Sequence, residues 1–221
     1  MKEQLQKDFD NIIRNLSLSQ RDTEIKQFYL DNFINKGFPN RRDENWKFSD
    51  LNQIIKKNIG ELSFYNDYTS TNKVDTSVFV DGLEHNKIVF INGRIEKIDF
   101  DYEKKDQIEI IDKSETINKF NNNNSLSDLN NAFTNKSFKI IVKNGYQLVK
   151  PLIIYHITNP DIWSKNINLR LDFELGKDSS LRLIDLYNDT SEKNFLNIFY
   201  NFDLKENAVL KNYKVDKFEN K

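Results

Sequence analysis

Hydrophobic residues recur at helical spacing through the first part of the chain. Two sets of apolar side chains lie three or four positions apart within residues 3–36: Leu5, Phe9, Ile12, Ile13 and Leu16, and then Ile25, Phe28, Tyr29 and Phe33. This spacing predicts two amphipathic helices, and Gly37 and Pro39 mark the end of the second. Ser49 is a suitable N-terminal cap for a third, short helix that ends near Gly60, with Leu51, Ile54 and Ile55 on its inner face.

The middle of the chain combines a hairpin and a short helix. Residues 61–80 are polar and irregular, which indicates an extended crossing with loops. Two strand-like runs, 87–91 and 94–98, flank Asn92-Gly93, a dipeptide that tolerates the two positive φ angles of a type I′ turn. Residues 121–124 read as a loop, and Ser125 with Asp128 resembles a capping box. This start predicts a short helix lined by Leu126, Leu129, Ala132 and Phe133.

Further along the chain the hydrophobic period changes to two. Ile167, Leu169, Leu171, Phe173 and Leu175 alternate with Asn168, Arg170, Asp172 and Glu174, which predicts a strand with one buried face. A shift of 29 positions places Leu196, Ile198, Tyr200, Phe202 and Leu204 on the same pattern, and Leu210 opposite Leu181. The reverse shift places Phe138, Ile140, Val142, Leu152 and Ile154 on it. Three registers with one spacing predict a right-handed β-helix (β-solenoid), and a β-sandwich with regular strands is the alternative.

These elements predict an α+β chain with three parts. Residues 1–60 form an N-terminal helical domain, residues 61–135 a linker with the hairpin and the capped helix, and residues 136–221 the β-helix rungs. A solenoid needs a terminal cap, and the last predicted strand is centred on Tyr213 with no closing helix after it. We therefore expect the β-helix to be incomplete at the C-terminus, and either a segment beyond Lys221 or a partner to cover the last rung.

Composition argues against several functional classes. The 221 residues carry 33 basic and 34 acidic side chains, so no overall positive charge attracts a nucleic acid. The charged first residues contain no signal-peptide core, and no apolar stretch is long enough for a membrane span, which favours a cytoplasmic protein. The chain has no cysteine, which excludes a thiolate nucleophile and a cysteine-ligated metal on this chain.

Candidate catalytic chemistry is sparse in the sequence. His85 and His156 are the only histidines and belong to no metal-binding motif. His85 is interpreted as a loop residue, whereas His156 is either a structural residue or a ligand shared with another chain. Asp172 and Glu174 share the predicted solvent face of a strand, where a solvated role is expected. The six glycines form no nucleotide-binding loop, so an enzyme active site within this chain is not expected.

Four short motifs follow one another along the chain. They are Phe38-Pro39 followed by Glu44-Asn45-Trp46-Lys47-Phe48-Ser49-Asp50-Leu51, then Phe90-Ile91-Asn92-Gly93-Arg94, Leu129-Asn130-Asn131-Ala132-Phe133 and Lys150-Pro151-Leu152-Ile153. In this order they resemble the SufB/SufD family of scaffold proteins in the SUF system of iron–sulphur cluster assembly, and the first motif is similar to the signature of its SufD branch. One departure is Asn135-Lys136, which stands where the family has an acidic-glycine turn.

The resemblance implies a SufD-like, non-catalytic scaffold subunit of a SufBCD complex. Its partners would be a SufB-like paralogue and a SufC-like ATPase, and this chain would carry no cofactor, catalytic residue or metal ligand. The lack of cysteine agrees, because SufB is expected to supply the cluster-building thiolate. Family members are longer, so the resemblance also implies an N-terminal portion whose main docking segment lies beyond Lys221. The alternatives are an interaction module unrelated to metal chemistry and, less favoured, a carbohydrate-active β-solenoid.

Trp46 lies among charged and polar residues in the first motif. An aromatic ring in such a segment is expected to reach back into a hydrophobic core. We predict that Trp46 is a hydrophobic anchor that holds the linker to the helical domain or to the first strands.

Overall fold

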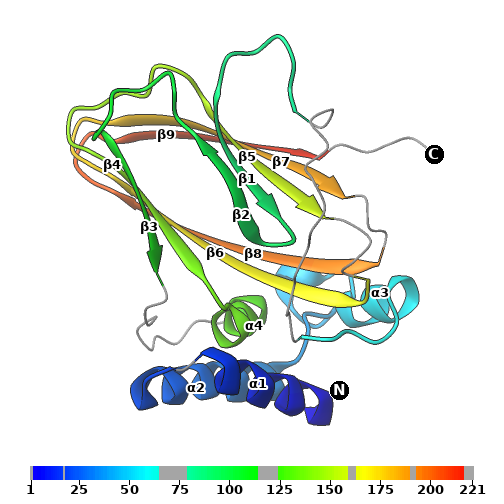
Figure 1. Ribbon diagram of the computed structural model, residues 1–221. Helices are drawn as coiled ribbons and strands as arrows, with labels where there is room; N and C mark the ends of the chain where they lie inside the picture. The colour runs from blue at the N-terminus through cyan, green and yellow to red at the C-terminus, as the bar shows by residue number, and fades with distance from the viewer. Residues whose placement is uncertain are drawn as a thin grey trace.

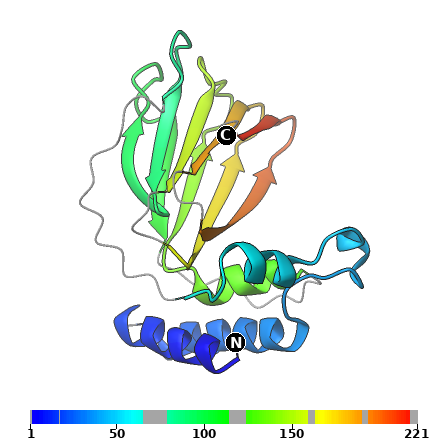
Figure 2. The same ribbon diagram turned by 90° about the vertical axis from the view of Figure 1, so that its right-hand side faces the viewer.

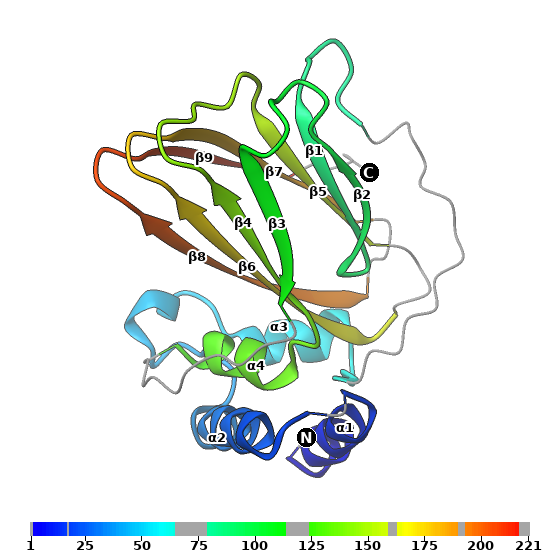
Figure 3. The same cartoon turned by 60° about the vertical axis from the view of Figure 1, so that its left-hand side comes forward.

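The computed structural model describes residues 2–16, 18–64, 79–113, 124–158, 163–189 and 193–216. Within these ranges the chain forms two facing sheets and a layer of helices outside one of them (Figures 1 and 3). The helices are α1 (Lys2–Leu16), α2 (Gln20–Lys36), the short η1 (Glu44–Trp46), α3 (Leu51–Asn58) and α4 (Ser125–Phe133). None of these helices is long and apolar enough to cross a lipid bilayer. The predictions for residues 65–78 and 121–123 lie outside the described residues.

The strands divide between a five-stranded and a four-stranded sheet. The first sheet has the order β2-β1-β5-β7-β9, and the second has the order β3-β4-β6-β8. Their bounds are β1 (Asn86–Ile91), β2 (Arg94–Asp99), β3 (Ile108–Lys113), β4 (Ser137–Val142), β5 (Leu152–Thr158), β6 (Lys165–Leu175), β7 (Ser180–Asp189), β8 (Asn194–Leu204) and β9 (Val209–Asp216). Only the pairs β1–β2 and β3–β4 are antiparallel, and the other pairs are parallel.

The prediction of a right-handed β-helix was wrong. The strands form two separate, mostly parallel sheets, and the described chain is a mixed α/β fold. Their inner faces share one hydrophobic core, to which β5 contributes Leu152 and β6 contributes Leu171. The alternative, a β-sandwich with regular strands, agrees better with two sheets that share a core, although the strand pairs here are mostly parallel. A period of two reports that one face of a strand is buried, and it cannot distinguish a coil of rungs from two stacked sheets.

The 29-residue spacing is correct for the last strands and wrong for the earlier ones. Ile167 pairs with Leu196 across β6 and β8, and Leu181 pairs with Leu210 across β7 and β9. Phe138, however, pairs with Leu171 rather than with Ile167. The reason is the length of the connections, because residues 143–151 separate β4 from β5 whereas residues 176–179 separate β6 from β7.

The predicted helices and hairpin are confirmed, with two changes at the helix starts. Asn92 and Gly93 have the positive φ angles, 50° and 79°, that the turn between β1 and β2 requires. Asp50, rather than Ser49, caps α3 by accepting a hydrogen bond from the backbone N–H of Gln53. Asn124, rather than Ser125, caps α4. In α3, Leu51 and Ile55 are buried but Ile54 is not.

Strand β3 was not predicted, because its residues were assigned to the linker. It pairs with β4 and forms the outer edge of the four-stranded sheet. Its sequence, IEIIDK, has a mixed polar pattern that does not alternate cleanly. An edge strand that is only partly covered needs no regular apolar face, so its sequence signal is weak.

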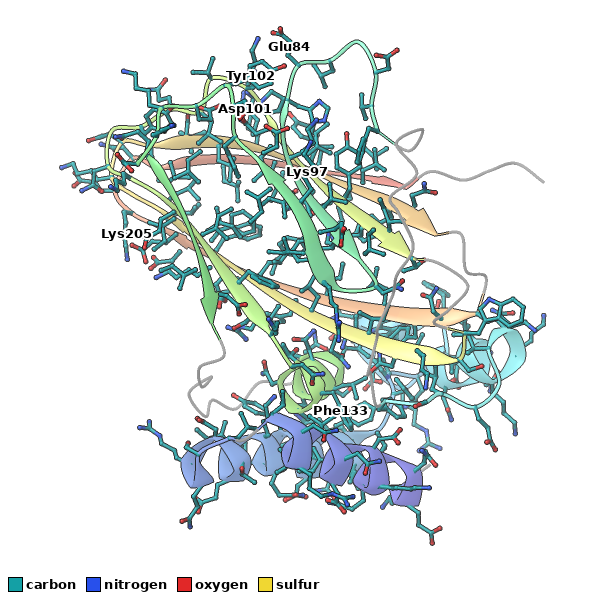
Figure 4. The ribbon with its side chains drawn as sticks, viewed as in Figure 1. Glu84, Lys97, Asp101, Tyr102, Phe133 and Lys205 are labelled. Carbon is teal, nitrogen blue, oxygen red and sulfur yellow. The ribbon has the colours of Figure 1, made fainter. Side chains whose placement is uncertain are left out.

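Helix α4 joins the helical layer to the four-stranded sheet. Leu129, Ala132 and Phe133 belong to the same hydrophobic core as the buried residues of α1 and α2. Phe133 lies where α4 faces α1 and α2 (Figure 4), and its ring packs edge-on against Phe9 with 6.1 Å between centroids. The division into a helical domain (1–60) and a linker (61–135) stays a prediction. Helix α4 belongs to the predicted linker by sequence but packs against α1 and α2 of the predicted helical domain.

The other face of α4 is fastened to the sheet by amide side chains. Asn130 is fully buried, and its Nδ2 donates to the carbonyl oxygens of Leu169 (3.1 Å) and Asn197 (2.8 Å) in neighbouring strands. Asn197 returns a hydrogen bond to the carbonyl oxygen of Leu126 (2.9 Å). Asn168, predicted to face solvent, is therefore only 9% exposed, because α4 covers this end of β6.

Trp46 occupies the place that was predicted for it, although its ring is only partly buried. It packs against the core formed by the helices. Because part of the ring already contacts water, Trp46→Ala should lower the free energy of unfolding by about 1–2 kcal/mol, less than for a fully buried ring. Chemical denaturation of the wild type and the variant would measure this difference. A loss below about 0.3 kcal/mol would contradict the anchoring role.

Lys26 of α2 reaches the end of α4. Its ammonium group donates to the carbonyl oxygens of Asn131 (3.3 Å), Ala132 (3.4 Å) and Thr134 (2.6 Å). Burial lowers the pKa of Lys26 from 10.5 to about 8, and the nearby Asp22 opposes the shift. Lys26 is thus a second link between α2 and α4.

The lowered pKa of Lys26 predicts a pH dependence of stability. Between pH 8 and 10.5 the unfolded chain binds this proton more tightly than the folded protein does. The contribution of Lys26 to the free energy of unfolding should therefore rise with pH through this window, by no more than about 3 kcal/mol. Urea unfolding at several pH values would measure the slope, and Lys26→Met should flatten it. An equal slope in both proteins would contradict the assignment.

Candidate functional site

A polar cluster interrupts the hydrophobic core between the two sheets. The inward face of β5 runs Leu152, Ile154 and then His156, and the inward face of β7 runs Leu183, Asp185 and then Tyr187. The parallel register places His156 beside Tyr187, while Tyr200 approaches from β8 of the opposite sheet. Strands that are apolar at one end therefore become polar at the other, inside the same core.

The cluster has a compact hydrogen-bond geometry. The hydroxyl of Tyr200 lies 2.9 Å from Nε2 of His156 and donates a short hydrogen bond to Oδ1 of Asp185. Nε2 of His156 and Oδ1 of Asp185 are 3.5 Å apart. His156 is 3% exposed and Asp185 is 0% exposed. Oδ2 of Asp185 is also buried and has no hydrogen-bond partner among the described residues.

Aromatic rings hold the imidazole of His156 in place. The ring of Tyr187 stacks on the imidazole with 4.9 Å between ring centroids, and the ring of Phe90 stacks on it with 5.7 Å between centroids. The parallel register of β1, β5 and β7 produces this column, because Phe90, His156 and Tyr187 are successive partners. Stacking restricts rotation of the imidazole, so its Nε2 stays directed at Tyr200 and Asp185.

The electrostatics of the cluster follow from its burial. Burial lowers the pKa of His156 below its usual range, while the hydrogen bond and charge of Asp185 act in the opposite direction. Burial also raises the pKa of Tyr200 well above its ordinary value, and the nearby Asp185 and Tyr187 add to that increase. Without a bound ion, the cluster therefore favours a neutral imidazole and a protonated phenol.

The other polar residues that the sequence suggested do not join this cluster. His85 lies on the outer side of β5, where its Nε2 is 2.8 Å from the hydroxyl of Tyr155. Asp172 pairs with Arg170 (3.0 Å), and Glu174 pairs with Lys139 (2.5 Å). These acidic side chains are partly buried in ion pairs, in place of the fully solvated role that was predicted. Asp185 and Tyr200 were not singled out, because each stands within a regular strand pattern.

A second carboxylate, Glu103, has a structural role in the loop between β2 and β3. It accepts hydrogen bonds from Nδ2 of Asn86 (2.6 Å), the hydroxyl of Tyr146 (2.6 Å) and the backbone N–H groups of Val149 and Lys150. Burial would raise the pKa of Glu103, but these donors together lower it. A carboxylate whose oxygens already accept four hydrogen bonds holds three chain segments together and is poorly suited to bind a ligand.

A cleft between the helices and the sheets is the next candidate for a functional site. Its volume is about 900 Å³, and it lies between α1, the turn after β1 and the strand β4. About half of the lining side chains are apolar, with Leu16, Ile110, Phe133 and Ile167 as examples, and the others are polar or charged. Two of its charged side chains, Asp112 and Lys136, pair with each other at 3.1 Å. The cleft therefore gives no reason to assign it a reaction.

Strands β8 and β9 form the edges of their sheets on the same side of the molecule (Figure 2). No described strand pairs with their outer edges. Several apolar side chains on these strands are about half exposed: Leu204 46%, Val209 50%, Tyr213 55% and Val215 45%. An exposed edge with apolar side chains is a ready site for pairing with another segment.

Neither the protein-family models nor the curated proteins give a match to this chain.

Proposed function

We propose that this chain is a non-catalytic, SufD-like scaffold subunit in the assembly of iron–sulphur clusters, located in the cytoplasm. Its partners are a SufB-like paralogue and a SufC-like ATPase, which supplies the ATP-driven motion. No family model matches the chain, so the identity of the partners rests on the four motifs alone.

The places of the motif residues in the fold support a structural role for them. Trp46 packs against the helical core, and Asn92-Gly93 form the turn of the β1–β2 hairpin. Gly93 leaves no room for a side chain, because an added Cβ would lie 2.7 Å from Cγ2 of Ile167. Asn130 and Phe133 fasten α4 to the sheet and to the helices. These residues hold the helices, the hairpin and the sheets together, and a firmly packed subunit suits a scaffold.

The observation that carries the proposal is the pair of open edges at β8 and β9. Unpaired backbone groups lie beside exposed apolar side chains on two adjacent edges, so a partner can extend both sheets at once. We assign this surface to the SufB-like paralogue, because a related subunit would carry strands of similar spacing.

Co-purification tests the proposal. A tagged version of this chain, expressed with the SufB-like and SufC-like proteins of the same organism, should retain both on the affinity column. Val215→Lys should weaken retention at least tenfold, because it places a charge on the proposed contact. Ile98→Lys is the matched control, since Ile98 is similarly exposed (46%) on β2, at the opposite edge of the same sheet.

Two results would count against the scaffold role. Purification without either partner would leave a binding module with no part in metal chemistry. If Val215→Lys and Ile98→Lys lost retention equally, the partner would not bind specifically at the edges of β8 and β9.

A further inference from the structure

We propose that His156, Asp185 and Tyr200 form a binding site for a ferric ion between the two sheets, with the hydroxyl of Tyr187 in reach as a fourth ligand. The site lies in the core, inward of the partner surface at the edges of β8 and β9, and it does not depend on the scaffold role. It is also a change from the sequence-based expectation that this chain holds no metal ligand.

The first argument is the spacing of the donor atoms. Ligand atoms about 2.0–2.2 Å from one ion lie roughly 3–3.5 Å from each other in tetrahedral or octahedral geometry. Nε2 of His156 is 2.9 Å from the hydroxyl of Tyr200 and 3.5 Å from Oδ1 of Asp185. The third edge, between Tyr200 and Asp185, is a short hydrogen bond, whose proton an ion would replace. Two of the three edges thus have the spacing of a coordination face, and the Tyr200 and Asp185 oxygens would move apart when an ion replaced the proton between them.

The second argument is the unsatisfied oxygen of Asp185. A buried polar atom without a partner costs about 1–3 kcal/mol, so native proteins rarely keep one. Oδ2 of Asp185 is such an atom within the described part of the chain. Coordination by both oxygens of the carboxylate would satisfy it. Asp185 is fully buried, and it therefore meets an ion without competition from bulk water.

The third argument is the chemical nature of the donors. Carboxylate and phenolate oxygens are hard, anionic ligands, and imidazole is a common ligand of iron. Two phenolates and one carboxylate would together balance a charge of +3, which favours Fe³⁺ over a divalent ion. A bound cation also reverses the local effect on ionisation, because it stabilises the phenolate that burial alone disfavours. Binding would release the hydroxyl proton of each coordinating tyrosine to solvent.

The ligand Tyr200 belongs to an edge strand and lies beside an exposed lysine. Tyr200 stands on β8, the edge strand of its sheet, and Lys214 of the other edge strand, β9, places Nζ 5.8 Å from the ring centroid of Tyr200. Lys214 is exposed. Movement of this flexible side chain would open the cluster from the β8 and β9 side without any change in the sheets.

A titration with ferric nitrilotriacetate tests the proposal. The full chain should develop a saturable visible charge-transfer band at one equivalent of iron, and Raman excitation in that band should enhance tyrosine vibrations. Tyr200→Phe should lower the affinity at least tenfold and remove most of the band. Tyr155→Phe is the matched control, because Tyr155 is also buried and also contacts a histidine, His85, but has no carboxylate partner among the described residues.

Asp185→Asn provides a second variant that keeps both tyrosines. Circular dichroism establishes that each variant is folded before the titration. Asp185→Asn should also bind iron at least tenfold more weakly, whereas Tyr155→Phe should bind like the wild type. The proposal is overturned if the wild type shows no saturable band, if Tyr155→Phe and Tyr200→Phe lose it equally, or if only a colourless divalent ion binds. The Raman signature of the wild type decides the matter if neither variant of the cluster folds.

Discussion

Phe133→Ala should lower the free energy of unfolding by about 3–5 kcal/mol. Phe133 is 2% exposed and lies in the helical core, with its ring between those of Phe9 and Phe64. Alanine would leave a cavity where α4, α1 and the segment around Phe64 meet. The backbone of these three segments limits how far the cavity can collapse. Phe9 would also lose its edge-on ring contact with Phe133, and Phe64 would lose its tilted one.

Urea unfolding monitored by circular dichroism would measure the effect of Phe133→Ala. Phe48→Ala is the control, because Phe48 is 88% exposed and its removal should change stability by less than about 0.5 kcal/mol. If Phe133→Ala proved as mild as Phe48→Ala, α4 would not join the helices to the sheets in the way that the structure describes.

Asn130→Asp should lower the free energy of unfolding by about 2–4 kcal/mol. The side chains have almost the same shape, but the aspartate cannot donate a hydrogen bond to the carbonyl oxygens of Leu169 and Asn197. The buried carbonyl oxygen of Leu169 and the partly buried one of Asn197 would lose this donor, and a carboxylate oxygen would face both. The hydroxyl of Thr134, which donates to Oδ1 of Asn130 (2.9 Å), would keep its partner.

Thermal and urea unfolding would measure this loss as well. Asn52→Asp is the matched control, because Asn52 lies on the exposed side of α3 and should change stability by less than about 0.5 kcal/mol. A stability of Asn130→Asp equal to that of the wild type would mean that the amide network does not hold α4 on the sheet. Asn130 would then have no structural role to explain its place in the third motif.

The sequence predicts local elements of this protein better than their assembly. The helices of residues 2–36 and the hairpin at Asn92-Gly93 depend on spacing and on turn chemistry, which act between near neighbours. The arrangement of strands into two sheets depends on the lengths of the connections, and a single period of 29 cannot describe connections of unequal length. The inward face of β6 was predicted, but the burial of Asn168 depends on α4, which is distant in sequence.

The polar cluster illustrates a further limit of sequence patterns. His156 was noticed because histidine is rare in this chain, whereas Asp185 and Tyr200 have many counterparts. They meet only because β5 and β7 are neighbours in one sheet and β8 lies opposite them in the other. A useful signal was present in the inward column of β7, where the hydrophobic alternation of Leu181 and Leu183 continues as Asp185 and Tyr187. A charged residue at a position that the pattern assigns to the core indicates a special environment.

The central proposal is that this protein binds another subunit along the open edges of β8 and β9. Amide hydrogen exchange, followed by mass spectrometry with and without the SufB-like protein, tests this most directly. We predict slower exchange in peptides from β8 (Asn194–Leu204) and β9 (Val209–Asp216), with unchanged exchange in β2 at the opposite edge. Unchanged exchange in β8 and β9 at saturating partner, or protection confined to α1 and α2, would contradict the claim.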